Sequence, residues 1–161
     1  MKKTILVVDD QPPTRRFLRS VLEREGYRVI EAEDEASAYE AVRQEETPIT
    51  LAMIDVNLPG LKGRHVANNL RSFGPLPVVF MTGDSAPNLI AEGSLEEGAP
   101  LIEKPFTVSG VMEAINHLMK EQNLGNDALE PAVVRSAKSK FKVQSSKWSG
   151  TSHVELRRSP D

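Results

Sequence analysis

Short apolar runs and amphipathic stretches alternate along the first 120 residues of the chain. The apolar runs have the length of β-strands. The first, third and fourth are apolar almost without interruption, as expected for strands buried on both faces. The five predicted strands are Thr4–Val8, Tyr27–Ala32, Ile49–Ile54, Pro77–Met81 and Pro100–Glu103.

Between the predicted strands, apolar residues recur at helical spacing, so each stretch has one apolar face. Gly26 is expected to end the first helix, Asp34 to cap the second, and Thr107 to mark the start of the fifth. The residues that define the five faces are Phe17, Leu18, Val21 and Leu22; Ala38, Ala41 and Val42; Val66, Ala67 and Leu70; Leu89, Ile90 and Leu95; and Val111, Met112, Ile115, Leu118 and Met119.

This alternation predicts an α/β fold, a doubly wound parallel sheet of five strands with five helices that cover both faces. We expect the flavodoxin-like strand order 2-1-3-4-5. In such sheets ligands bind beyond the carboxyl ends of the strands, near the point where the strand order reverses. The polar residues that follow the strands are therefore the candidates for chemistry.

The character of the sequence changes after Lys120. Residues 1–120 contain 13 Lys and Arg and 18 Asp and Glu, whereas residues 121–161 contain 7 and 5. The run 122–127 predicts a helix end and a linker, and the Ser- and Lys-containing residues beyond it predict a mostly flexible tail, with a short strand at 140–143 as its candidate element. We expect one domain over residues 1–120, followed by a linker and a basic tail over residues 121–161.

Composition excludes several classes of protein. The chain has no cysteine, so disulfides, thiolate metal sites and cysteine nucleophiles are absent. The first apolar run is too short for a signal peptide or a membrane span, so we expect a cytoplasmic protein with no membrane partner. The acidic main domain argues against broad nucleic-acid binding by that part of the chain. His65, His117 and His153 have no metal-ligand spacing, and we expect surface or half-buried packing for them.

Polar residues follow four of the predicted strands. Asp9 and Asp10 follow the first strand, Asp55 the third, Thr82 the fourth and Lys104 the fifth. Each has an ordinary interpretation as a turn, a cap or a solvated side chain, but together they are expected to meet at one edge of the sheet. Three close carboxylates repel one another, and a hard cation such as Mg²⁺ relieves that repulsion. An aspartate that accepts a phosphoryl group, with a cation and an ammonium beside it, fits this set.

Four runs in this order and spacing resemble the receiver domains of two-component response regulators, the chemotaxis regulators among them. They are Ile5–Asp10, Asp55–Gly60 with Gly63, Thr82–Gly83 and Lys104–Phe106, and the resemblance covers roughly residues 3–120. It implies a signalling switch that catalyses only its own phosphoryl transfer and dephosphorylation. The donor would be a histidine kinase or a histidine phosphotransfer protein, and a downstream protein would read the altered surface.

The resemblance also implies roles for single residues. Asp55 would be phosphorylated, and Asp9, Asp10, Asp55 and the Asn57 carbonyl would hold Mg²⁺. Thr82 and Lys104 would bind the phosphoryl group, and the bond before Pro105 would be cis. Asn57 and Asp84 would flank the attacking water and set the rate of phosphate loss, although Asp84 could instead cap the following helix.

Two positions depart from the family pattern. Leu101 replaces the aromatic residue that usually moves together with the threonine, so the threonine half of the switch remains without its ring. Pro100 replaces a commonly acidic residue on the face that many relatives use to dimerise. A phosphorylation-dependent homodimer is kept as an alternative.

Two rival functions remain at this point. A DNA-binding regulator could use the basic and aromatic residues of the tail, which are Lys138, Lys140, Lys142, Lys147, Arg157 and Arg158 with Phe141 and Trp148. A Mg²⁺-dependent phosphatase would need a second acid two residues after Asp9, and Gln11 stands there.

Overall fold

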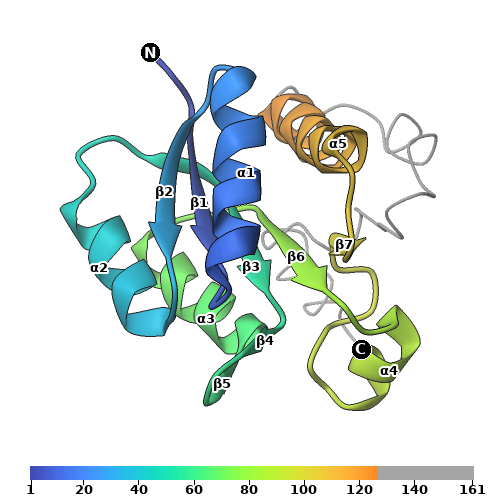
Figure 1. The fold of residues 1–161 in the computed structure, drawn as a ribbon. Helices are drawn as coiled ribbons and strands as arrows, with labels where there is room; N and C mark the ends of the chain where they lie inside the picture. The colour runs from blue at the N-terminus through green and yellow to red at the C-terminus, as the bar shows by residue number, and fades with distance from the viewer. Residues whose placement is uncertain (127–161) are drawn as a thin grey trace, which may run out of the picture.

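The computed structural model describes residues 1–126, and its centre is a parallel sheet of five strands (Figure 1). The strands are β1 (Thr4–Val8), β2 (Arg28–Ala32), β3 (Ile49–Asp55), β6 (Val78–Thr82) and β7 (Leu101–Glu103). Their order across the sheet is β2-β1-β3-β6-β7. When these five strands are numbered by their order along the chain, β6 is the fourth and β7 the fifth, and the order is the predicted 2-1-3-4-5. The predicted fold is confirmed.

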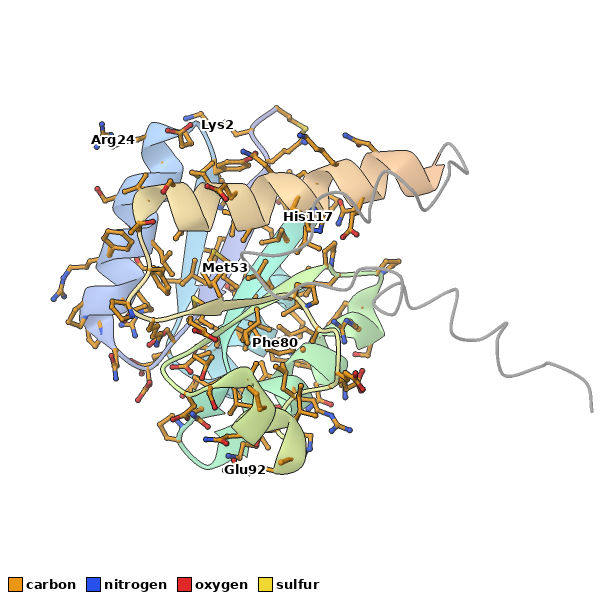
Figure 2. All side chains as sticks on the ribbon, turned by 90° about the vertical axis from the view of Figure 1, so that its right-hand side faces the viewer. Lys2, Arg24, Met53, Phe80, Glu92 and His117 are labelled. Carbon is orange, nitrogen blue, oxygen red and sulfur yellow. The ribbon has the colours of Figure 1, made fainter. Side chains whose placement is uncertain are left out.

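Helices cover both faces of the sheet. They are α1 (Pro12–Arg24), α2 (Glu35–Gln44), α3 (Gly63–Leu70), α4 (Ala86–Ala91) and α5 (Val108–Asn126), with a short 3₁₀ helix η1 (Arg71–Phe73) after α3. Alternate residues of each strand enter different cores, as the pleat requires. Ile5 and Val7 pack with α1 and α5, whereas Leu6 and Val8 pack with α2 and α3. Figure 2 shows the same division for Met53, which lies beneath α5, and Phe80, which lies on the opposite side of the sheet.

The predicted helix boundaries are set by local hydrogen bonds. Asp34 Oδ1 accepts a hydrogen bond from Ser37 N at 2.8 Å, which forms a capping box at the start of α2. Thr107 Oγ1 accepts from Gly110 N at 3.1 Å at the start of α5. Gly26, just beyond α1, has a φ of 90°, a conformation that a side chain disfavours. These three predictions are confirmed.

Some predicted details are wrong. Phe17 and Ile90 belong to the predicted apolar faces of their helices, yet they are 37% and 38% exposed, because each lies at the edge of that face. Leu95 is buried, but it lies beyond the end of α4. The predicted linker from residue 122 is helical as far as Asn126, since Gln and Asn cost a helix little and one Gly costs only about 1 kcal/mol relative to Ala. The predicted tail strand at 140–143 lies outside the described residues.

A small hairpin directly after β3 was not predicted. It consists of β4 (Asn57–Leu58) and β5 (Leu61–Lys62), which pair antiparallel. Pro59 and Gly60 form its turn, and Gly60 has a φ of 76°, as position three of a type II turn requires. The hairpin lies at the edge of the sheet toward which the arrowheads of β1, β2 and β3 point in Figure 1. This is the edge where the candidate residues gather.

Candidate functional site

The carboxyl ends of four strands bring the predicted residues to one edge of the sheet. Asp9 follows β1 and Asp55 ends β3; both are buried, at 0% and 5% exposure. Thr82 ends β6 and is also fully buried, and Lys104 follows β7. Strand ends from distant parts of the sequence therefore supply a single polar cluster, as the sheet topology predicts.

Three carboxylates in this cluster lie close together. One oxygen from each of Asp9, Asp10 and Asp55 lies within 4.8 Å of the other two. Backbone donors orient the two buried carboxylates, because Gln11 N donates to Asp9 Oδ1 at 2.8 Å and Asn57 N donates to Asp55 Oδ1 at 2.9 Å. The turns after β1 and β3 therefore fix the direction in which these carboxylates point.

Lys104 binds both buried carboxylates. Its Nζ donates to Asp9 Oδ2 at 2.7 Å and to Asp55 Oδ2 at 3.2 Å. Burial opposes the charge of Lys104, but the hydrogen bonds and the attraction of the two carboxylates outweigh it and raise the pKa of the lysine. For Asp55, burial is the largest effect and raises its pKa, although the Asn57 amide and Lys104 act in the opposite direction. The Lys104–Pro105 peptide bond is cis, as expected.

The donor set fits a magnesium ion. When ionised, the carboxylates of Asp9, Asp10 and Asp55 carry one negative charge each, and Lys104 offsets one of the three. The two negative charges that remain equal the charge of a divalent cation. Carboxylate oxygens are the hard ligands that Mg²⁺ prefers, and it needs only a few of them because it keeps several water ligands.

A chain of hydrogen bonds connects the hairpin with Thr82. Lys62 Nζ lies 3.4 Å from Asn57 Oδ1, and Asn57 Nδ2 donates to Asp84 Oδ2 at 2.8 Å. Asp84 N in turn donates to Thr82 Oγ1 at 2.9 Å. The alternative that Asp84 caps α4 is wrong, because Ser85 is the N-cap residue and makes no side-chain cap. The carboxylate of Asp84 binds Asn57 instead.

Lys62 is the functional candidate that the sequence interpretation missed. A lysine between Leu61 and Gly63 carries no signal by itself. The run Leu58-Pro59-Gly60-Leu61 could have revealed it, because a Pro-Gly turn predicts a tight hairpin that places the residues on either side opposite each other.

The remaining candidates lie away from the cluster. Leu101 is 3% exposed and packs in the same core as Leu89 and Phe80. His65 is exposed on α3, and His117 is buried in α5, where burial lowers its pKa. His153 lies outside the described residues. Over residues 1–126 no helix has both the length and the apolar character that crossing a bilayer requires.

Comparison with known proteins agrees with this geometry. The family model described as the response regulator receiver domain matches residues 5–116. The chain belongs to the response-regulator receiver family. It is a component of two-component signal transduction, and phosphorylation and Mg²⁺ binding are typical of this family. A receiver is a signalling switch and not a metabolic enzyme.

Individual relatives extend this assignment. The receiver protein CpdR of Brucella abortus is 32% identical over 118 residues, which are 73% of this chain and 97% of CpdR. The aerobic respiration control protein ArcA of Escherichia coli is 38% identical over 137 residues, 83% of this chain and 56% of ArcA. The crystal structure of a response regulator receiver protein from Sinorhizobium medicae matches with a TM-score of 0.63 at 26% identity, over 74% of this chain and 95% of that one. The chain thus spans nearly all of some relatives but only about half of ArcA.

Proposed function

We propose that this receiver is switched by a phosphoryl group on Asp55. The donor is a phosphohistidine of a histidine kinase or of a histidine phosphotransfer protein, and the protein acts in the cytoplasm, as is typical of response regulators. The observation that carries the proposal is the contact of one ammonium, Lys104 Nζ, with two buried carboxylates, Asp9 Oδ2 and Asp55 Oδ2. Burying charged groups costs free energy even when they are paired, and such clusters occur preferentially at functional sites.

The residues have distinct roles in the transfer. An Asp55 carboxylate oxygen attacks the phosphorus, the bond from phosphorus to the donor nitrogen breaks, and an acyl phosphate forms. Lys104 and the Thr82 hydroxyl bind the oxygens of the transferred group, which removes Lys104 from Asp55 as a partner. Asp9, Asp10, Asp55 and the Asn57 carbonyl would hold Mg²⁺, which neutralises charge on the phosphoryl oxygens when it is bound.

The test uses a small phosphodonor with Mg²⁺ and intact-protein mass spectrometry. The native chain is expected to gain one phosphoryl group that hydroxylamine removes, since hydroxylamine cleaves acyl phosphates and leaves phosphate esters. Asp55→Asn is expected to gain none, because an amide cannot form the acyl phosphate. A single phosphate on Asp55→Asn would contradict the site assignment.

Asn57 and Asp84 are proposed to set the lifetime of the phosphate. Both side chains are short, polar and exposed, and the hydrogen bond between them places them next to each other. Each can hydrogen-bond a water near the in-line position opposite Asp55. We expect phosphate loss in Mg²⁺ without a partner to be faster in the native chain than in Asn57→Met or Asp84→Tyr. Equal decay in all three would remove this role.

The output is proposed to be a protein-interaction surface of residues 1–120. The basic residues of the tail favour a second candidate, which is DNA binding through residues 121–161. Replacing Lys138, Lys140 and Lys142 with Ala in the full chain separates the two. If DNA is the partner, the native chain binds duplex DNA with strong salt dependence and the variant does not; if a protein is the partner, neither binds DNA.

A further inference from the structure

The carboxyl edge of the sheet, where Asp55 lies, contains a second lysine besides Lys104, and the proposed phosphoryl transfer does not use it. Lys62 is exposed, and its Nζ lies 3.4 Å from Asn57 Oδ1. We propose that Lys62 is a positioning residue, which holds the Asn57 side chain against Asp84 and so lengthens the lifetime of phosphorylated Asp55. This inference rests on the proposed phosphorylation of Asp55 and adds a residue that regulates its reversal.

The hairpin gives Lys62 a fixed place relative to Asp55. Asn57 and Lys62 are direct partners in the β4–β5 register. Gly63 N donates to Val56 O at 2.8 Å, and a Cβ at Gly63 would overlap the Asp55 carbonyl oxygen. The backbone on both sides of the hairpin is therefore packed against the end of β3. The backbone at Lys62 therefore has little freedom to move, and the side chain starts from a fixed position opposite Asn57.

The two charged neighbours of Asn57 select one orientation of its amide. Lys62 can only donate hydrogen bonds and the Asp84 carboxylate can only accept them, whereas the amide has one donating and one accepting side. Lys62 therefore faces Oδ1, and Asp84 faces Nδ2, which donates to Asp84 Oδ2 at 2.8 Å. Each contact supports the other, because a reversed amide would place its oxygen against the carboxylate and its NH₂ against the ammonium.

This arrangement bears on the water that removes the phosphate. The two side chains proposed to orient that water, Asn57 and Asp84, are bound to each other. While this bond persists, Asn57 Nδ2 and Asp84 Oδ2 use one donor and one acceptor on each other that could otherwise hold the water, and loss of phosphate is slowed. Asp84 is also joined through its backbone N to Thr82 Oγ1, so the bonded pair is continuous with the phosphoryl-binding hydroxyl.

The test compares phosphate decay in full-length variants with Mg²⁺ and no partner. Lys62→Glu presents an acceptor where a donor stood, so it turns the Asn57 amide over and separates it from Asp84. We expect decay about two- to five-fold faster than in the native chain, with the difference shrinking at about 1 M salt because the contact is exposed. Lys62→Arg, which still donates, should decay at the native rate. Lys2→Glu makes the same charge change at an exposed residue of the N-terminus and should also decay at the native rate.

A second readout follows the amide itself. The side-chain NH₂ signals of Asn57, assigned by their loss in Asn57→Asp, should shift in Lys62→Glu and stay in place in Lys62→Arg and Lys2→Glu. Native decay in Lys62→Glu, or equal acceleration by Lys2→Glu, would overturn the role of Lys62 while leaving phosphorylation intact. Absence of phosphate from every variant and from the native chain would instead overturn the proposed function.

Discussion

The carboxyl edge of the sheet and helix α5 both bury ionisable groups, and the surroundings of these groups differ. At the carboxyl edge of the sheet, Asp9 and Asp55 each accept a backbone hydrogen bond and share the ammonium of Lys104. On α5, the Glu121 side chain is only 15% exposed and its Oε1 accepts no hydrogen bond from the described residues, while His117 Nε2 lies 3.8 Å away. Burial raises the pKa of Glu121 to about 7 and lowers that of His117.

The two regions differ in whether a buried carboxyl group finds hydrogen-bond donors and a positive charge in the folded chain. Burial raises the pKa of Asp55, but the hydrogen-bond donor and the ammonium that it gains on folding oppose this rise and favour the charged form. A carboxyl group that gains neither takes up a proton instead. The carboxyl edge is therefore built to hold negative charge, whereas the α5 pair responds to pH.

The largest expected effect on stability comes from removing the Lys104 ammonium, which offsets the negative charge of the buried carboxylates at the carboxyl edge of the sheet. Lys104→Met leaves the buried Asp9 and Asp55 without their cation and should lower the free energy of unfolding by about 2 kcal/mol without metal. Urea denaturation measures it, with Lys120→Met, an exposed lysine on α5, as the matched control. Mg²⁺ should restore part of the loss. Equal stability of the two variants would show that Lys104 does not offset the burial of these carboxylates.

Removing one carboxylate from the carboxyl edge of the sheet should weaken Mg²⁺ binding and stabilise the metal-free fold. Asp10→Ala is expected to weaken Mg²⁺ binding about tenfold, because it deletes a hard oxygen ligand. It should also raise metal-free stability by about 0.5 kcal/mol, since like charges in the cluster repel. Titration calorimetry and urea denaturation measure the two effects. Unchanged affinity for the ion would mean that Asp10 is not a ligand, directly or through water.

The third expected effect is a dependence of folding stability on pH, which comes from Glu121 on α5. Below about pH 4.5 Glu121 is protonated whether the chain is folded or unfolded. Between there and its folded pKa of about 7, the unfolded chain releases the proton first, so stability falls as the pH rises. Glu121→Gln removes this fall, and above pH 7 it should be more stable than the native chain by about 1 kcal/mol, a value reduced for partial exposure.

Thermal unfolding at a series of pH values measures this difference. Glu113→Gln, at an exposed residue of the same helix, serves as the control. The control should track the native chain at every pH. A constant offset between Glu121→Gln and the native chain, with no dependence on pH, would show that the Glu121 carboxyl does not titrate on folding in this range.

Regular patterns made the fold and the cluster predictable from the sequence. Alternating apolar runs and helical faces define the strands, and a doubly wound sheet places residues after the strand ends together, which is why Asp9, Asp55 and Lys104 could be grouped across long stretches of chain. The hairpin strands are two residues each, too short to carry a period. The resemblance placed Asn57 and Asp84 near each other but did not predict their direct hydrogen bond, because that bond depends on side-chain orientations that only the tertiary structure sets.

The identity of the phosphorylated residue decides whether Asp55 is the phosphoacceptor. Borohydride reduces an acyl phosphate to an alcohol and leaves an unmodified carboxylate intact, so peptide mass spectrometry can locate the modified aspartate after treatment with a phosphodonor and Mg²⁺. Phosphorylation of Asp55 predicts homoserine at position 55 and unaltered Asp9, Asp10 and Asp84. Reduction at any of those three residues, or a phosphate that borohydride does not convert, would contradict it.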